Sequence, residues 1–292
     1  MIRHEVIQSE ENKSVERILL DNYNVNRNDI FKALRKKDIK INGARVKSNV
    51  LLNVGDIIEA YILIKQEVDT RNWYTVAFEN EYVLIVNKKQ GIPVISESKD
   101  EVSLINLINK DFKAEYQLCH RIDRNTGGLV IISKIISYTD IIKKTINDRY
   151  FNKIYKCIVW GNAENLVGTH KAWLFKDSDK NQVYIYNEKK KYTKEIITVI
   201  KKAEYNSVNN TSTLEIDLIT GRTHQIRAHL AFLGHFIIGD GKYGINEINR
   251  KFDLKYQALW ACCLEPNINV SSFKEYNGIL PNHKIIIEPS FE

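Results

Sequence analysis

The sequence predicts an α+β chain with a small N-terminal module and a larger second module. Two helical patterns followed by short strands and tight turns define the first module, residues 14–64. Residues 65–73 are polar and are expected to form a linker. Residues 74–292 contain several strand patterns and few helical ones, and the chain is long enough for one large domain with a small one attached.

The first module begins with a predicted helix, SVERILLDNY, for which Ser14 is a suitable N-cap. A second helix is expected at about residues 28–37. After it, Asn42-Gly43 marks a tight turn between short strands, and a Gly-Asp turn in VGDIIEAYI precedes an apolar strand. This order predicts two helices covering a small sheet.

The second module begins with two strands joined by a Glu-Asn turn, TVAFENEYVLIV, followed by a Gly-Ile-Pro loop. Residues 136–149 have a helical period, with Ser137 as the expected cap. Strands are predicted at 153–161, 182–188 and 212–220. A helix is then expected from the Gly221-Arg222 turn to Gly234, a residue suited to ending it.

Composition favours a globular protein without membrane spans. No run of eighteen apolar residues occurs, and MIRHEVIQSEENKS has neither an apolar core nor a small-residue cleavage site, so we expect a cytoplasmic location. Four cysteines (Cys119, Cys157, Cys262, Cys263) lack C-x-x-C spacing and are expected to be buried thiols. They support neither a disulfide framework nor a zinc ribbon.

The formal net charge of +7 has an uneven distribution. Residues 27–47 contain eight basic and two acidic side chains, a net charge of +6. The basic ones are Arg27, Lys32, Arg35, Lys36, Lys37, Lys40, Arg45 and Lys47. Such a concentration is typical of a surface that binds a polyanion, although a charge run can also be a solvated helix face.

The stretch HRIDRNTGGLVIISK, residues 120–134, places Asp123 between Arg121 and Arg124. Guanidinium groups favour the ionised form of a neighbouring carboxylate, which then suits a nucleophile or a charge-positioning group. On this window alone, a surface ion pair explains the pattern equally well. Two further blocks combine polar and apolar residues: KIYKCIVWG, which contains Tyr155, and LITGRTHQIRAHLAFLGHFIIGDGKYG.

These blocks resemble motifs of the RluA-type pseudouridine synthase family. HRIDRNTGGLVIISK is similar to H-R-L-D-x-x-T-S-G-L-L-x-x-A-K, and TGRTHQIRAHLAFLGHFIIGDGKYG to T-G-R-x-H-Q-I-R-x-H-x-x-x-x-G-x-P-I-x-G-D-x-x-Y-G. KIYKCIVWG resembles K-x-Y-x-A-x-V-x-G, and YVLIVNKKQGIPV an N-K-P-x-G strand. The resemblance implies a catalytic domain on a mixed, mostly antiparallel sheet flanked by helices.

The resemblance also implies an activity, the isomerisation of specific uridines in structured RNA to pseudouridine. Asp123 would be the catalytic aspartate, Arg222 its partner, and Tyr155 a wall of the uracil pocket that takes part in proton transfer. The residues expected to bind substrate are Arg121, Arg124, Thr126, Thr223 and His224. The reaction needs an ionised carboxylate and a pocket that retains the freed base, so no cofactor and no metal are expected.

The first module resembles an S4 RNA-binding domain through its basic second helix, I-K-I-N-G and V-G-D-I-I. This resemblance implies that the eight basic residues of segment 27–47 contact RNA. It favours large-subunit (23S) ribosomal RNA or a pre-ribosomal particle as substrate, with a monomeric enzyme. The alternatives are a tRNA-directed synthase and a non-catalytic RNA-binding protein of ribosome assembly, which would lack the Asp or the Arg.

Several positions depart from the family pattern: Lys89 and Phe236 replace prolines, Gly127 replaces a serine, and Trp260 replaces a common histidine. None removes an expected catalytic group. Tyr155 could also be an ordinary core aromatic, because tyrosines are frequent in strands. His224, His229 and His235 lack metal-ligand spacing and are expected to be structural or to contact RNA. A kinase H-R-D loop is excluded because Ile122 interrupts it and no D-F-G follows.

Overall fold

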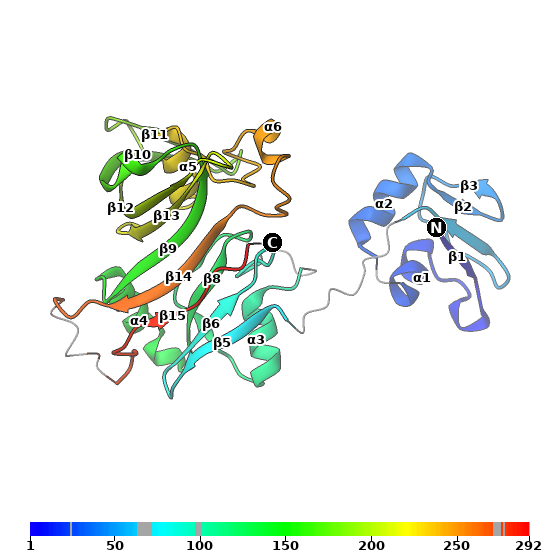
Figure 1. Cartoon of the computed structure of the whole chain (residues 1–292). Coiled ribbons are helices and arrows are strands. Elements are labelled where there is room, and N and C mark those ends of the chain that lie inside the picture. The colour runs from blue at the N-terminus through cyan, green and yellow to red at the C-terminus, as the bar shows by residue number, and fades with distance from the viewer. Residues whose placement is uncertain (24, 63–71, 97–100, 271–275, 277, 292) are drawn as a thin grey trace. The chain divides into compact units, whose positions relative to one another are not determined.

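The computed structural model describes residues 1–23, 25–62, 72–96, 101–270, 276 and 278–291. The chain divides into two compact units, Met1–Arg71 and Asn72–Glu292 (Figure 1). Most of the expected linker 65–73 lies outside the described residues. Among the described helices, none is both long and apolar enough to cross a membrane.

The first unit contains a four-stranded antiparallel sheet in the order β1-β4-β2-β3. Its strands are β1 (Ile2–Glu5), β2 (Ile39–Ile41), β3 (Ala44–Arg45) and β4 (Ile57–Ala60). The expected start at Ser14 is therefore too late, because β1 pairs along its whole length with β4. Asn42 and Gly43 form the expected turn between β2 and β3, both with positive φ.

Two helices pack against one face of this sheet, α1 (Val15–Asn22) and α2 (Arg27–Lys36), after a short 3-10 turn, η1 (Gln8–Glu10) (Figure 1). Ser14 caps α1 as predicted, accepting a hydrogen bond from the Arg17 N–H. The apolar sides of both helices join Ile39 and Ile58 in one core. The polar side of α2 consequently carries its basic residues into solvent.

The second unit contains one mixed sheet, which confirms the predicted fold. Its described strands are β5 (Tyr74–Glu79), β6 (Val83–Lys88), β7 (Gln117–Leu118), β8 (Gly127–Ser133), β9 (Phe151–Trp160), β10 (Gly168–Asp177), β11 (Gln182–Tyr186), β12 (Lys194–Asn206), β13 (Thr211–Leu218), β14 (Leu259–Pro266) and β15 (Ile285–Ile286). The main order is β11-β10-β12-β13-β9-β14-β8-β6-β5. Of the described strand pairs, only β14 with β8 is parallel.

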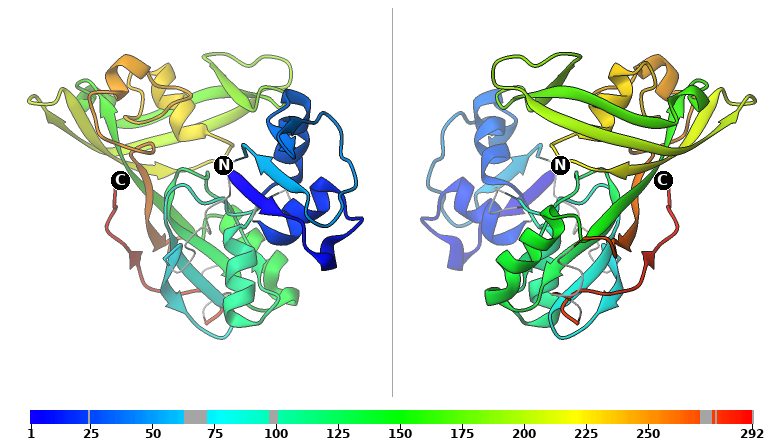
Figure 2. Two further views of the ribbon diagram at one scale, coloured as in Figure 1. Left: turned by 90° about the vertical axis from the view of Figure 1, so that its right-hand side faces the viewer. Right: turned by 90° about the vertical axis from the view of Figure 1, so that its left-hand side faces the viewer.

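The helical segments of this unit are η2 (Ile136–Tyr138), η3 (Glu164–Leu166), α3 (Leu104–Phe112), α4 (Thr139–Asn147), α5 (Gln225–Phe232) and α6 (Asn246–Asn249). Figures 1 and 2 show α5 beside β10–β13 at one end of the sheet, and α3 and α4 at the other. The prediction of Ser137 as a cap was wrong, because the N-cap of α4 is Tyr138. Residues 136–138 form a 3-10 turn ahead of the helix.

The centre of the sheet is buried on both faces. Strand β8 sends Val130 and Ile132 into one core, together with α3 and α5. It sends Leu129 and Ile131 into a second core with α4. A strand held on both faces gives the loop before it a rigid base, and that loop carries Asp123. The four cysteines are buried and unbridged, as expected.

Strand β8 begins at Gly127, which pairs with Trp260 of the neighbouring strand β14. A Cβ at Gly127 would lie 2.3 Å from the Trp260 ring, so this position accepts no side chain. Gly128 has a φ of +116°, and its Cβ would lie 2.3 Å from the Ala261 carbonyl oxygen. Two departures from the family pattern, Gly127 and Trp260, are thus in direct contact.

The buried histidine of α5 should make stability depend on pH. His229 is 1% exposed, its Nδ1 lies 3.0 Å from the Thr198 hydroxyl, and burial followed by repulsion from His170 lowers its pKa to about 4. Below about pH 6.5 the unfolded chain binds a proton that the folded chain excludes, so stability should fall with pH down to about pH 4. Between pH 7.5 and 5 the loss should be about 2 kcal/mol greater in wild type than in His229→Gln. Urea unfolding at pH 7.5 and pH 5 measures the loss of stability in each protein. Equal losses in wild type and His229→Gln would show that His229 does not cause the pH dependence.

Candidate active site

A cleft of about 670 Å³ opens beside the Asp123 loop. It is lined by residues 119–123, by β9 through Lys153 and Tyr155, and by residues 218–222 and 224–227. Arg149, Thr126 and Leu259 complete its wall among other residues. Three sequence blocks that are far apart in the chain therefore meet at one cavity, and each contributes polar side chains to it.

Asp123 lies in the loop between β7 and β8. Its carbonyl oxygen accepts a hydrogen bond of 3.0 Å from the Thr126 N–H, which closes a turn directly before β8. The side chain of Asp123 is 23% exposed, so its carboxylate faces the cleft while being partly shielded from water. This placement presents the carboxylate to a molecule bound in the cleft.

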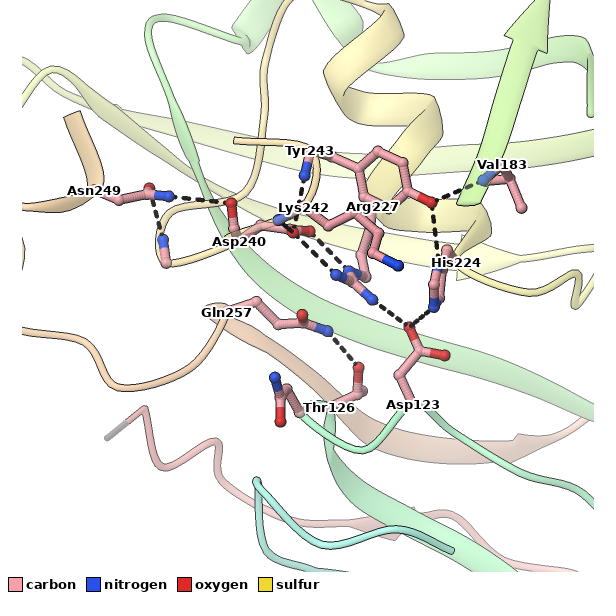
Figure 3. A network of polar contacts seen from close by, with 12 residues as sticks. Asp123, Thr126, Val183, His224, Arg227, Asp240, Lys242, Tyr243, Asn249 and Gln257 are labelled. Atoms are coloured by element: carbon pink, nitrogen blue, oxygen red, sulfur yellow. Dashed lines mark hydrogen bonds and ion pairs between the residues drawn. The ribbon is translucent and has the colours of Figure 1, made fainter. Parts of the chain in front are cut away.

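The guanidinium that pairs with Asp123 belongs to Arg227, not to Arg222 as the sequence suggested. Arg227 Nη1 lies 3.0 Å from Asp123 Oδ2 (Figure 3). Arg222 lines the cleft but is exposed, and its backbone N–H donates to the Gln225 side chain. The reason is the start of α5, which begins at Gln225 rather than at residue 222 and therefore presents Arg227 from its first turn.

Arg227 is held on its other side by Asp240. Its Nε and Nη2 donate to the two oxygens of Asp240 at 2.7 and 2.9 Å, a bidentate pair with a carboxylate that is fully buried. Asp240 also accepts the N–H groups of Lys242 and Tyr243 at 2.9 and 3.1 Å. One guanidinium thus bridges two carboxylates, and its orientation toward Asp123 is fixed from behind.

In Arg227 and Asp240, burial opposes the charged form while hydrogen bonds and opposite charges favour it. For Arg227, burial opposes the charged form, but the hydrogen bonds and attraction of Asp240 and Asp123 prevail and raise its pKa. For Asp240, burial again opposes the charge, while Arg227 and the two backbone N–H groups lower its pKa. Both groups therefore stay ionised at neutral pH, and Arg227 offers Asp123 a permanent positive charge.

His224 approaches the same carboxylate from the N-cap of α5. It has a φ of +52°, and its Nε2 lies 4.0 Å from Asp123 Oδ2. Its Nδ1 lies 2.9 Å from the Tyr243 hydroxyl, which accepts the Val183 N–H at 3.0 Å. Burial lowers the pKa of His224 against the attraction of Asp123, which favours a neutral ring. Figure 3 shows this second line of contacts beside the Arg227 bridge.

Tyr155 of β9 lies in the cleft wall and is 7% exposed. It stands between Ile216 of β13 and Ala261 of β14, in the centre of the sheet. Burial, with a smaller contribution from Asp123, raises its pKa, so the phenol keeps its proton. A flat, neutral ring at this place can support a planar base, and its part in proton transfer stays a prediction.

Two further cations in the cleft were missed by the sequence analysis. Arg149 donates through Nη2 to both oxygens of Asp217 at 3.1 Å, and it has a φ of +63°. Lys153 lies two residues before Tyr155 on β9, on the same face of the strand. Burial, followed by repulsion from Arg149, lowers the pKa of Lys153. Because residues two apart on a strand share a face, the spacing of Lys153 and Tyr155 was the signal in the sequence that could have placed Lys153 in the cleft.

The remaining predicted substrate-binding residues lie at different distances from the cleft. Arg121 lines it, whereas the half-exposed Arg124 side chain pairs with Glu101 at 2.8 Å. Thr126 is 2% exposed, and its hydroxyl accepts a hydrogen bond from Gln257 (Figure 3). Thr223 is half-buried and is not among the residues that line the cleft.

The three histidines of the third block have separate environments. His229 contacts Thr198, and His235 Nδ1 lies 2.9 Å from the Trp160 carbonyl oxygen. His224 belongs to the Asp123 site. Across the part of the chain that the structure describes, no group of three or more His, Cys, Asp or Glu residues could hold a metal ion.

In the first unit, most of the predicted RNA-binding side chains are exposed. Lys32, Arg35 and Lys36 lie on α2, while the exposed Lys37, Arg45 and Lys47 follow it, and Lys40 is half-buried. Arg27 differs, because its Nε lies 2.5 Å from a Glu16 oxygen and its guanidinium lies over the Phe31 ring. Its charge is thus partly committed within the unit.

Comparison with known proteins identifies the class of protein to which this chain belongs. Residues 82–232 match the family model of RNA pseudouridylate synthase. An uncharacterized RNA pseudouridine synthase of Mycoplasma genitalium is 31% identical, over 92% of this chain and 90% of its own length. The ribosomal large subunit pseudouridine synthase C of Buchnera aphidicola is 31% identical, over 80% of this chain and 79% of its own.

A solved structure, that of human RNA pseudouridylate synthase domain containing 1, shares the fold. It superposes with a TM-score of 0.58 at 20% identity, and the match covers 71% of this chain and 83% of that one. The chain is thus an enzyme that isomerises uridine in RNA to pseudouridine. It belongs to the RNA pseudouridylate synthase family.

The bridge predicts a large difference between two arginine variants. Arg227→Met leaves the fully buried Asp240 without its partner and should lower the free energy of unfolding by about 3–5 kcal/mol. Arg222→Met, the matched control, removes an exposed side chain and should change it by about 0.5 kcal/mol or less. Urea unfolding at pH 7.5 compares them, and similar losses would show that Arg227 is not the structural centre of the site.

Proposed function

We propose that this enzyme modifies uridine in large-subunit ribosomal RNA, with Asp123 as its catalytic carboxylate. The observation that carries the catalytic assignment is the Arg227 guanidinium, fixed by Asp240 and placed 3.0 Å from Asp123 at the cleft. The choice of RNA is supported by relatives named as ribosomal large subunit pseudouridine synthases. A tRNA substrate is the alternative for the same chemistry.

The proposed chemistry uses side chains that the cleft brings together. Pseudouridine formation breaks the bond between C1′ and N1, turns the base and joins C5 to C1′. C5 then releases its proton, and N1 takes one up. Asp123 would attack the sugar or promote loss of the C2′ proton, and the Arg227 guanidinium, 3.0 Å away, would hold its carboxylate in place. Tyr155 would support the freed base, and the reaction needs no cofactor or metal.

Reaction at a nucleobase requires that it leave its helical stack. The cleft of about 670 Å³ is large enough to receive an extruded nucleotide. Arg121, Arg149 and Lys153 line it with Arg222, and they would meet the negatively charged backbone on either side of the target. Arg124, Thr126, Thr223 and His224 were predicted to bind substrate, and of these the geometry favours His224, next to Asp123.

We propose that the first unit is an S4-like RNA-binding domain. Two helices on a small sheet, the Asn42-Gly43 turn and the exposed basic residues of segment 27–47 support this proposal. Phosphate contacts supply affinity without base specificity, so this unit would place the enzyme on a folded RNA or a pre-ribosomal particle. In this proposal the enzyme acts in the cytoplasm as a monomer.

Asp123→Asn should abolish turnover without disturbing binding. The amide keeps the shape of the side chain but loses the anion, so the single-turnover rate should fall by roughly 10³-fold or more. RNA affinity should stay within about twofold of wild type, because the cations of the cleft remain. Tritium release from 5-tritiated uridine measures the rate, and Asp253→Asn, at an exposed aspartate, is the control. A fully active Asp123→Asn protein would refute the mechanism.

Charge reversal in the first unit should produce the opposite pattern. Replacing Lys32, Arg35 and Lys36 with glutamate should weaken RNA binding and reduce its salt dependence by about two to three units of slope. The single-turnover rate at saturating RNA should stay near that of wild type. The control reverses Lys110, Lys113 and Lys144, exposed lysines of the second unit. Unchanged affinity and slope after reversal on α2 would reject the S4-like assignment.

A further inference from the structure

The loop that carries Asp123 is held by side chains from behind the cleft at three consecutive residues. The carbonyl oxygens of Arg124 and Asn125 and the hydroxyl of Thr126 each accept a hydrogen bond from a buried side chain. These contacts come from two segments distant in sequence, one around Gln90 and one at Gln257. The Arg227 bridge orients the carboxylate, whereas these contacts restrain the backbone beneath it.

Gln90 makes the central contact. It is 8% exposed, and its Nε2 donates to the Asn125 carbonyl at 2.9 Å and to the Gln257 carbonyl at 2.6 Å. Because both neighbours are carbonyl oxygens, only the NH₂ end of the amide fits there. One side chain therefore ties the Asp123 loop to the segment that leads into β14.

Gln257 continues the connection. It is 2% exposed, and its Nε2 donates to the Thr126 hydroxyl at 2.9 Å (Figure 3). Its own backbone oxygen is the group that Gln90 holds. The two glutamines and the loop thus form a closed ring of hydrogen bonds, so that moving the loop requires breaking more than one of them.

Lys88 supports the same loop one residue earlier. Its fully buried Nζ donates to the carbonyl oxygens of Lys89, Ile92 and Arg124 at 2.7, 2.9 and 3.0 Å. These bonds also fix the turn that carries Gln90. The glutamines differ from Lys88 in being neutral, so they can restrain the loop without competing with Arg227 for the charge of Asp123.

We infer that Gln90 and Gln257 are positioning residues for catalysis, which keep the Asp123 carboxylate at the reacting sugar. The inference rests on the proposed role of Asp123. A catalytic group displaced by about 1 Å can lose on the order of 100-fold in rate. Because neither glutamine lines the cleft, their removal should slow the chemical step while leaving RNA binding intact.

The first experiment separates rate from binding and folding. Gln90→Met keeps the length of the side chain and removes both hydrogen bonds, and Gln182→Met, on β11 at the far edge of the sheet, is the matched control. We expect Gln90→Met and Gln257→Met to lower the single-turnover rate at saturating RNA by roughly 10- to 100-fold. The RNA Kd should stay within about twofold, and Gln182→Met should match wild type.

The loss of rate in Gln90→Met relative to wild type should not arise from partial unfolding of the variant. Measured at two temperatures well below the melting temperature of each variant, the loss in Gln90→Met should persist. A loss that disappears on cooling would mean that these residues only stabilise the fold, and would overturn the inference. So would a Gln90→Met protein with the wild-type rate.

A conservative variant supplies a signature that general destabilisation would not produce. Gln90→Glu is the same size, but its carboxylate cannot donate a hydrogen bond, whereas the protonated acid can donate one. Its rate relative to wild type should therefore rise as pH falls from 8 to 6, with folding checked by circular dichroism at each pH. Gln90→Met should show no such rise, and identical profiles would contradict the inference.

The same assays include Asp123→Asn, which keeps the two outcomes distinguishable. If Asp123→Asn is inactive and the glutamine variants are unaffected, the proposed mechanism stands and the positioning role fails. If Asp123→Asn is fully active, the proposed mechanism fails, and the positioning inference fails with it.

Discussion

The site depends on placing a guanidinium between two carboxylates in a nearly dry environment. Asp240 is fully buried, so it needs Arg227, and the two backbone N–H groups of the turn after it complete its hydrogen bonds. Once Arg227 is held in this way, its Nη1 amino group has a defined direction, and Asp123 lies along it. The burial of the Arg227–Asp240 ion pair therefore determines where the partly exposed Asp123 carboxylate of the cleft must be.

The sheet holds Asp123 and Arg227 in place beside the cleft. Asp123 precedes β8, which is buried on both faces and pairs in parallel with β14, while Arg227 comes from α5, which packs in one of the two cores that β8 joins. The two partners are thus carried by different parts of one sheet rather than by adjacent residues. Such a site keeps its geometry only if the intervening strands β9, β13 and β14 stay in register, so the cleft and the fold depend on the same contacts.

The resemblance to a known family predicted the mixed sheet of the second unit, while local patterns in the sequence predicted the Asn42-Gly43 turn and the Ser14 cap. They failed where position depends on long-range contacts. The family resemblance implied Arg222 as the partner of Asp123, and the helix was expected to start at the Gly221-Arg222 turn. In the structure His224 adopts a left-handed conformation, α5 starts at Gln225, and Arg227 makes the pair. The first strand was missed because the four residues IRHE form a strand only through their pairing with β4. Gln90 and Gln257, more than 160 residues apart, carry no local signal of their contact.

The contact between Gly127 and Trp260 limits how this loop can be exchanged with that of another synthase. The indole ring occupies the space where a side chain at position 127 would begin, so a serine there requires a smaller residue at position 260. Either change alone would create a clash or a cavity next to the loop that carries Asp123. The two positions must therefore be inherited, or transplanted, as a unit, and a hybrid enzyme that joins segments of two synthases between them would bring together halves that do not fit.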